Sequence, residues 1–207
     1  MKKSKTSQRW LDEHEQDPFV QKARVAGYRS RAVYKLLEID DRLKLLKPGQ
    51  VVVDLGSAPG GWSQVVRQRM GSLGRVIALD ILEMAPIDGV ELVTGDFTED
   101  AVFGRLLEML GDEKVDLVIS DMAPNLSGMK AVDLPRSAYL VELALDFAQK
   151  MLKPGGNLLV KAFEGEGIDT LRRQFRNDYK KYVNLKPKAS RGRSREIYLA
   201  GIGKVPR

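Results

Sequence analysis

The chain has 207 residues, 43% of them hydrophobic, which suffices for one well-buried core, so we expect a single domain spanning residues 1–207. It has no cysteine and one histidine, His14, which excludes disulfides and thiolate metal sites and disfavours histidine-based chemistry, and we expect no bound metal. No apolar run approaches the roughly 18 residues of a membrane span, and the basic N-terminus is followed by polar residues. We therefore expect a cytoplasmic protein without a membrane partner.

The net charge of +6 conceals an uneven distribution along the chain. Residues 1–47 contain 12 Lys/Arg against 7 Asp/Glu, residues 48–171 contain 10 against 19, and residues 172–207 contain 12 against 2. An acidic centre between basic ends is typical of a catalytic domain that makes its own nucleic-acid contacts, because binding phosphates requires clustered Lys and Arg. Basic ends that only keep the fold in solution are the alternative. Residues 1–9 are expected to form a basic, disordered tail.

The N-terminal part is predicted to be helical. Asp17-Pro18 is a typical helix start, and the apolar residues of 32–39 recur at helical spacing. Ser30 is the expected N-cap of this second helix.

The stretch from Val51 to Trp62 predicts a strand, a tight turn and a helix that begins at Ser63. A short β-branched run before a glycine-rich loop is typical of a buried parallel strand, and the loop lets a ligand approach the backbone. A dinucleotide fingerprint would place a second glycine where Ala58 stands, and Pro59 has no N–H to offer a phosphate. The loop therefore favours a nucleotide-like ligand without phosphates.

Further strands and helices alternate along the chain. Strands are predicted at residues 74–80, 89–96, 114–121 and 157–163, with a last strand that follows a basic loop and ends near residue 200. Helices are predicted at 101–111 and at 134–152, the second ending at a Lys-Pro-Gly-Gly turn over 153–156. This alternation predicts an α/β fold with a mostly parallel, doubly wound sheet.

Four acids close successive predicted strands: Asp54, Asp80, Asp96 and Asp121. Ligands bind at the carboxyl ends of strands in such sheets, although a single acid there is as often a turn or helix cap. Asp80 follows Gly56 by 24 residues, which suits an acid that binds ribose hydroxyls, and Asp96 is a candidate for an adenine amino group.

Two charged residues in the C-terminal part of the chain, Lys161 and Glu196, are further candidates for the site. Lys161 interrupts an apolar strand, where an unpaired ammonium would be costly, so we expect it at the sheet edge near Asp121, acting on substrate. The alternative is a lysine that reaches solvent and pairs with Glu164 or Glu166. Glu196 is the one acid of the basic stretch 186–200, and by default it would neutralise a neighbouring arginine.

Together these residues resemble the FtsJ/RrmJ family of RNA 2′-O-ribose methyltransferases, of the bacterial type that acts on ribosomal RNA. The resemblance runs from about Trp10 to the C-terminus. It rests on Ser30-Arg31-Ala32-x-x-Lys35-Leu36, Asp54-Leu55-Gly56-x-Ala58-Pro59-Gly60-Gly61-Trp62, Asp121-Met122-Ala123-Pro124-Asn125-x-Ser127-Gly128, Val160-Lys161-x-Phe163 and Ser190-Arg191-x-Arg193-Ser194-Arg195-Glu196.

The resemblance implies a Rossmann-like fold dependent on S-adenosylmethionine, with a seven-stranded sheet, helices on both faces and an antiparallel last strand. It implies cofactor contacts at Gly60, Trp62, Asp80, Asp96 and Asp121. It also implies a catalytic tetrad of Lys35, Asp121, Lys161 and Glu196, and as substrate a uridine 2′-hydroxyl of 23S ribosomal RNA within the large (50S) subunit.

Methyl transfer requires alignment of nucleophile and methyl group and removal of a proton from a ribose hydroxyl. Lys161 is the candidate base, helped by Lys35 as a second cation, or else it orients the hydroxyl and stabilises the developing alkoxide; the residues leave both open. Three other functions compete: a nicotinamide-dependent oxidoreductase, a small-molecule methyltransferase, and a ribosome-assembly factor that binds RNA without catalysis. We expect a monomer.

Overall fold

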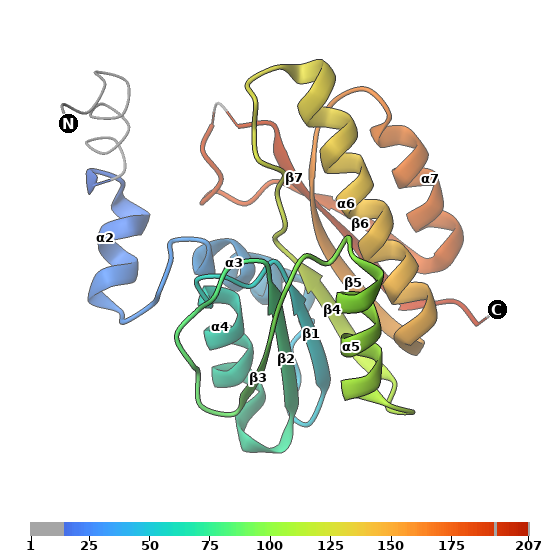
Figure 1. The fold of residues 1–207 in the computed structure, drawn as a ribbon. Coiled ribbons are helices and arrows are strands. Elements are labelled where there is room, and N and C mark those ends of the chain that lie inside the picture. Colours follow the sequence, from blue (N-terminus) through green and yellow to red (C-terminus); the bar gives the residue numbers. More distant parts are fainter. Residues whose placement is uncertain (1–14, 193, 207) are drawn as a thin grey trace.

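The protein, described by a computed structural model over residues 15–192 and 194–206, is built on one seven-stranded sheet. Figure 1 shows how the strands and helices are arranged. The strand order is β3-β2-β1-β4-β5-β7-β6. The strands are β1 (Val51–Leu55), β2 (Arg75–Asp80), β3 (Val90–Thr94), β4 (Val115–Ser120), β5 (Leu152–Phe163), β6 (Tyr179–Leu185) and β7 (Glu196–Lys204). The first five run parallel, and β7 lies antiparallel between β5 and β6. The predicted α/β sheet with an antiparallel last strand is confirmed.

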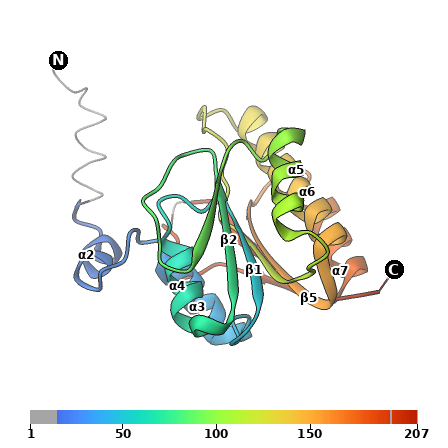
Figure 2. The same ribbon diagram turned by 60° about the horizontal axis from the view of Figure 1, so that its bottom comes forward.

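Helices cover both faces of the sheet, as Figure 2 shows. They are α2 (Pro18–Val25), α3 (Val33–Leu43), α4 (Gly61–Met70), the short 3₁₀ helix η1 (Gly71–Leu73), α5 (Asp100–Leu110), α6 (Lys130–Met151) and α7 (Ile168–Asp178). Side chains of β1 alternate between two cores: Val51, Val53 and Leu55 pack with α5, α6 and α7, whereas Val52 packs with α3 and α4. Because every residue of β1 is buried, helices must cover this strand on both faces of the sheet.

The face under α3 and α4 is the one that matters for the site. Val52, Val76, Ile119 and Leu159 lie in the core of this face. Because side chains alternate along a strand, the residues two or four positions further along β1, β2, β4 and β5 lie on the same face, near the carboxyl ends of these strands. Those residues are Asp54, Asp80, Asp121 and Lys161.

Several predicted boundaries are wrong in detail. Ser30 does not cap α3: the helix begins at Val33 after Ala32, without a side-chain cap, and it is the carbonyl of Ser30 that accepts from the N–H of Val33. The third strand ends at Thr94, so Asp96 follows it in a loop. The predicted start of α2 is confirmed, since the Asp17 carboxylate accepts from the N–H of Phe19 and Pro18 opens the helix.

The turn predicted at 153–156 is not a separate turn. The fifth strand starts directly after α6, because the buried Leu152 pairs with Val115. The register with β4 then shifts before Leu117 pairs with Asn157, so residues 153–156 form an irregularity inside β5. The patterns also missed α7 and β6 as individual elements. The tail predicted for residues 1–9 lies outside the described residues.

No helix in the described part of the chain is long and apolar enough to cross a membrane.

Candidate active site

A cavity of about 400 Å³ opens at the carboxyl ends of β1, β2 and β4. Its walls include Asp80, Asp96 and Asp121 together with the glycine loop after β1 and the irregular segment after β4. Three of the acids predicted for the site therefore line one space, although they come from segments far apart in the sequence.

The two acids at the β2 and β3 ends are held by local hydrogen bonds. The Asp80 carboxylate accepts from the N–H of Ala58 at 2.9 Å and of Leu82 at 2.8 Å, which ties the glycine loop to the end of β2. Asp96 accepts from the N–H and the hydroxyl of Thr98, both through Oδ1. Its second oxygen has no protein partner among the described residues and so remains available to a ligand.

Two glycines of the loop after β1 have positive φ angles and crowded surroundings; Gly56 lines the cavity, whereas Gly60 does not. Gly56 has φ +76°, and a Cβ there would lie 2.6 Å from Cγ of Met122 and 2.8 Å from its backbone. Gly60 has φ +104° and precedes α4, where a Cβ would lie 2.7 Å from Ile87. The loop therefore requires glycine at both positions for reasons of conformation and space.

Trp62 was expected at the cofactor, but its side chain is turned into the protein. It is 2% exposed, its indole N–H donates to the carbonyl of Ala32 at 2.8 Å, and its ring packs on Tyr198 at 5.7 Å. Neither Gly60 nor Trp62 is among the residues that line the cavity, so the structure does not place these two predicted contacts at it.

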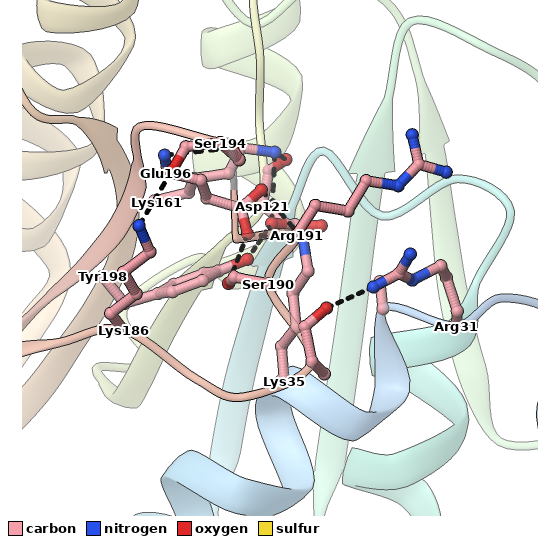
Figure 3. Close-up of polar contacts among 12 residues, drawn as sticks. Arg31, Lys35, Asp121, Lys161, Lys186, Ser190, Arg191, Ser194, Glu196 and Tyr198 are labelled. Atoms are coloured by element: carbon pink, nitrogen blue, oxygen red, sulfur yellow. Dashed lines mark hydrogen bonds and ion pairs between the residues drawn. The ribbon is translucent and has the colours of Figure 1, made fainter. Parts of the chain in front are cut away.

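Lys161 lies where the sequence placed it, beside Asp121. Its ammonium is 3.1 Å from Oδ1 of Asp121 and also donates to the carbonyl of the same residue, while the lysine side chain is only 9% exposed (Figure 3). The alternative pairing with Glu164 or Glu166 is not found among the described residues, and the Glu164 carboxylate pairs with Arg172 instead. Two acceptors thus hold a nearly buried ammonium at the end of β5.

A second lysine–carboxylate pair lies nearby. Lys35 of α3 contacts both carboxylate oxygens of Glu196, at 2.7 and 2.8 Å, and both side chains are 12% exposed. Glu196 also accepts from the hydroxyl of Ser190 at 2.8 Å. The acid therefore neutralises a lysine from the other end of the chain, not a neighbouring arginine as the default assumed. This pair borders a further cavity of about 270 Å³.

Tyr198, which the sequence analysis did not single out, joins the two pairs. Its hydroxyl donates to Oδ1 of Asp121 at 2.7 Å, and its ring lies 5.9 Å from the ammonium of Lys35. It stands directly opposite Lys161 in the β5–β7 register. Burial, with the Asp121 and Glu196 carboxylates adding to it, raises the pKa of Tyr198 well above its usual range, so the phenol stays a donor. Strand alternation from Glu196 would have placed it on the same face.

Asp54 is placed differently from the other acids. It lies inside β1, fully buried; its Oδ2 accepts from the hydroxyl of Ser63 at 2.7 Å, and its Oδ1 has no partner in the described part of the chain. Burial raises the pKa of Asp54 to about 7, with the Asp121 and Asp80 charges adding and the Ser63 hydrogen bond opposing. This acid lies behind the cavity and does not line it.

The chemistry of the cavity suits a cationic ligand rich in hydrogen-bond donors. Three carboxylates would repel a pyrophosphate, which argues against a nicotinamide dinucleotide. Ribose hydroxyls, an adenine amino group, an ammonium and a sulfonium all fit acceptors of this kind, so the residues present fit S-adenosylmethionine. Within the described ranges no group of His, Asp and Glu side chains is arranged to hold a metal ion.

Comparison with known proteins identifies the family of the chain. The model of the FtsJ-like methyltransferase family matches residues 28–204. A protein of Cellvibrio japonicus named ribosomal RNA large subunit methyltransferase E is 56% identical over 203 residues, which cover 98% of this chain and 96% of the relative. A Pseudomonas aeruginosa protein of the same name is 59% identical over 203 residues, 98% of each chain.

A solved structure shows the same fold. The crystal structure of a Plasmodium falciparum protein described as a ribosomal RNA methyltransferase superposes with a TM-score of 0.78 at 31% identity, covering 87% of this chain and all of that one. The family match spans all seven strands and both lysine–carboxylate pairs. The chain belongs to the FtsJ-like methyltransferase family.

Proposed function

We propose that this protein transfers a methyl group from S-adenosylmethionine to the 2′-hydroxyl of a uridine in 23S ribosomal RNA within the large (50S) subunit. In this proposal the chain is a single methyltransferase domain that works as a monomer in the bacterial cytoplasm. The names of its relatives support ribosomal RNA as the substrate. The observation that carries the proposal is the pair of lysine–carboxylate contacts, joined by Tyr198, at the rim of an acid-lined cavity.

The cofactor would be held by the acids of the cavity. Asp80 would accept from the ribose hydroxyls, Asp96 from the adenine amino group through its free oxygen, and Asp121 would attract the positively charged end. Gly60 and Trp62 would offer backbone groups at the start of α4. When bound, S-adenosylmethionine supplies an electrophilic methyl group on a sulfonium.

Lys161 would act on the target hydroxyl. Its ammonium donates to the carboxylate and to the carbonyl of Asp121. A third N–H remains for the ribose oxygen. In this role Lys161 orients the hydroxyl and stabilises the negative charge that develops on the oxygen, and the proton of the hydroxyl passes to water as the new C–O bond forms. Tyr198 fixes the carboxylate that positions this lysine.

Lys35 and Glu196 would position the ribose. Their salt bridge joins α3 to the start of β7, next to the smaller cavity, where an incoming nucleotide can donate to the carboxylate and accept from the ammonium. Because the pair is mostly desolvated, each partner holds the other in a fixed orientation, which lowers the entropic cost of aligning the substrate.

The test is transfer of labelled methyl from S-adenosylmethionine to ribosomal subunits from a strain that lacks this activity. Label should appear on a ribose of the large subunit and not in the small subunit. Lys161→Met keeps the side-chain length without the charge and should lower the rate about a hundredfold or more while cofactor binding persists. Lys153→Met is the matched control, since Lys153 lies at the other end of β5 and pairs with Asp116.

Each outcome decides one point. No labelling by the unmodified protein would refute methyl transfer and favour an RNA-binding assembly factor. Equal labelling by the protein and by Lys161→Met would keep the reaction but remove Lys161 from catalysis. Binding of NAD in place of S-adenosylmethionine, measured by calorimetry, would refute the cofactor.

A further inference from the structure

Two arginines from opposite ends of the chain face one carboxylate beside the proposed site. Arg31 precedes α3 and Arg191 lies in the loop before β7 (Figure 3). The Arg31 guanidinium forms an ion pair with Oδ2 of Asp17 and donates to the carbonyl of Ala189. Nε of Arg191 lies 3.9 Å from the same Asp17 oxygen.

Both arginines line two adjoining cavities. One, of about 270 Å³, contains the Lys35–Glu196 pair. The other, of about 490 Å³, contains Asp17 and Lys188. The arginines therefore connect the place where we put the ribose to a space whose walls hold three basic side chains and a single carboxylate among the described residues.

This arrangement needs an anion. Burial and the nearby charge of Arg191 lower the pKa of Arg31, and Nε of Arg31 is buried with no partner in the described part of the chain. Two guanidinium groups side by side repel each other unless a negative group lies between them. In the absence of RNA, Asp17 is that group.

The carboxylate that fills this place is held by a small contact surface. Asp17 caps α2, a helix of eight residues with only two buried side chains, Val20 and Ala23. Its other contacts include Tyr34, 5.6 Å from the Phe19 ring and 4.7 Å from the Lys22 ammonium. A phosphate diester bears the same charge as a carboxylate and matches the planar fork of arginine at least as well. A phosphate can therefore compete with Asp17.

From these contacts we propose that Arg31 and Arg191 bind one phosphate of the RNA backbone next to the target ribose, and that Asp17 occupies this subsite until RNA displaces it. The inference rests on the proposed function, because it takes RNA as the substrate. It adds a defined phosphate subsite and an internal competitor that weakens RNA binding.

The test measures binding of a short fluorescent oligouridylate to the full chain between about 50 and 200 mM salt. Asp17→Asn should tighten binding about threefold or more, because the competing charge is removed while asparagine still caps α2. Arg191→Gln should weaken binding and reduce the slope of log K against log salt by about 0.7, the value for one phosphate contact on a single strand. An oligomer with an uncharged methylphosphonate backbone should not distinguish the variants.

Arg176→Gln is the matched control. This exposed arginine lies near the C-terminal end of α7, where β6 begins opposite Lys204, at the far end of β7 from Glu196. The Arg176→Gln substitution removes one positive charge, as Arg191→Gln does, but the salt slope of oligouridylate binding should stay unchanged. In the double variant Asp17→Asn/Arg191→Gln, the Asp17→Asn change should tighten oligouridylate binding less than it does alone. The reason is that the Asp17 carboxylate weakens RNA binding by occupying the arginine that the phosphate would contact.

Three results would overturn the subsite: no oligouridylate binding by the unmodified protein, an Asp17→Asn variant that binds no more tightly, or an unchanged salt slope for Arg191→Gln. The binding assay needs no turnover, so the two proposals fail separately. If the salt slopes are as expected but no methyl transfer occurs, the proposed reaction is refuted and the phosphate subsite stands. Normal methyl transfer with unchanged slopes would refute the phosphate subsite alone.

Discussion

Replacing Asp54 by asparagine should remove most of one pH-dependent component of folding stability. The pKa of Asp54 is raised from 3.8 to about 7 by burial. An acid whose pKa is higher in the folded state holds its proton more tightly there, so its contribution to stability is full below about pH 4 and is lost as pH rises to about 7. The wild-type protein therefore becomes less stable across this range because of Asp54.

The magnitude follows from the shift. A raised pKa of about three units corresponds to about 4 kcal/mol over the whole range, and about 2.5 kcal/mol of it falls between pH 5 and pH 8. Asparagine cannot ionise, so Asp54→Asn lacks this loss. It keeps an acceptor for the Ser63 hydroxyl but places an amide where Oδ1 has no partner, at a cost of about 1–3 kcal/mol that does not depend on pH.

The assay is urea denaturation of both proteins at pH 5, 6, 7 and 8, followed by circular dichroism. The absolute stabilities are not diagnostic, because the asparagine brings its own cost. The diagnostic quantity is the difference in free energy of unfolding between the two proteins. From pH 5 to pH 8, Asp54→Asn should gain about 2.5 kcal/mol of stability relative to the wild type. Parallel pH profiles would show that Asp54 titrates normally and that burial does not control its charge.

Three further changes test the site and its frame. Tyr198→Phe removes the hydroxyl that holds Asp121 and should slow methyl transfer about tenfold while costing only about 1 kcal/mol of stability, as kinetics and denaturation would show. Gly56→Ala places a Cβ 2.6 Å from Met122 at a positive φ and should lower cofactor affinity in calorimetry; unchanged affinity would contradict a rigid loop. Lys204→Met removes the ammonium that donates to three carbonyls where α6 ends and should lower the melting temperature by several degrees without altering the KM for RNA.

The local patterns were sufficient for much of the fold. Strands β1 to β4 lie within a few residues of their predicted places and β5 ends where predicted, because buried parallel strands are short apolar runs between glycines and helices. The pattern failed where tertiary contacts override it. Leu152 pairs with β4 and starts β5 before the Pro-Gly-Gly stretch, and the strongly basic 172–185 region conceals α7 and β6.

The candidate site was also predicted only in part from the sequence. The types and positions of Asp80, Asp121 and Lys161 were evident because a charge at the end of an apolar strand needs a reason. The position of Lys161 near Asp121 was predicted as well. Only the structure shows that Lys35 takes Glu196 as its partner and that Tyr198 connects the two pairs.

The sequence by itself determined the α/β class and the list of charged residues to examine, and it predicts that the glycine loop binds a ligand without phosphates. The tertiary structure decided which charges meet. Lys35 and Glu196 are far apart in the chain, and no local pattern encodes a contact between them. The contact exists because α3 packs on the face of the sheet to which Lys161 and Tyr198 point, and because antiparallel β7 starts at the same edge where the parallel strands end.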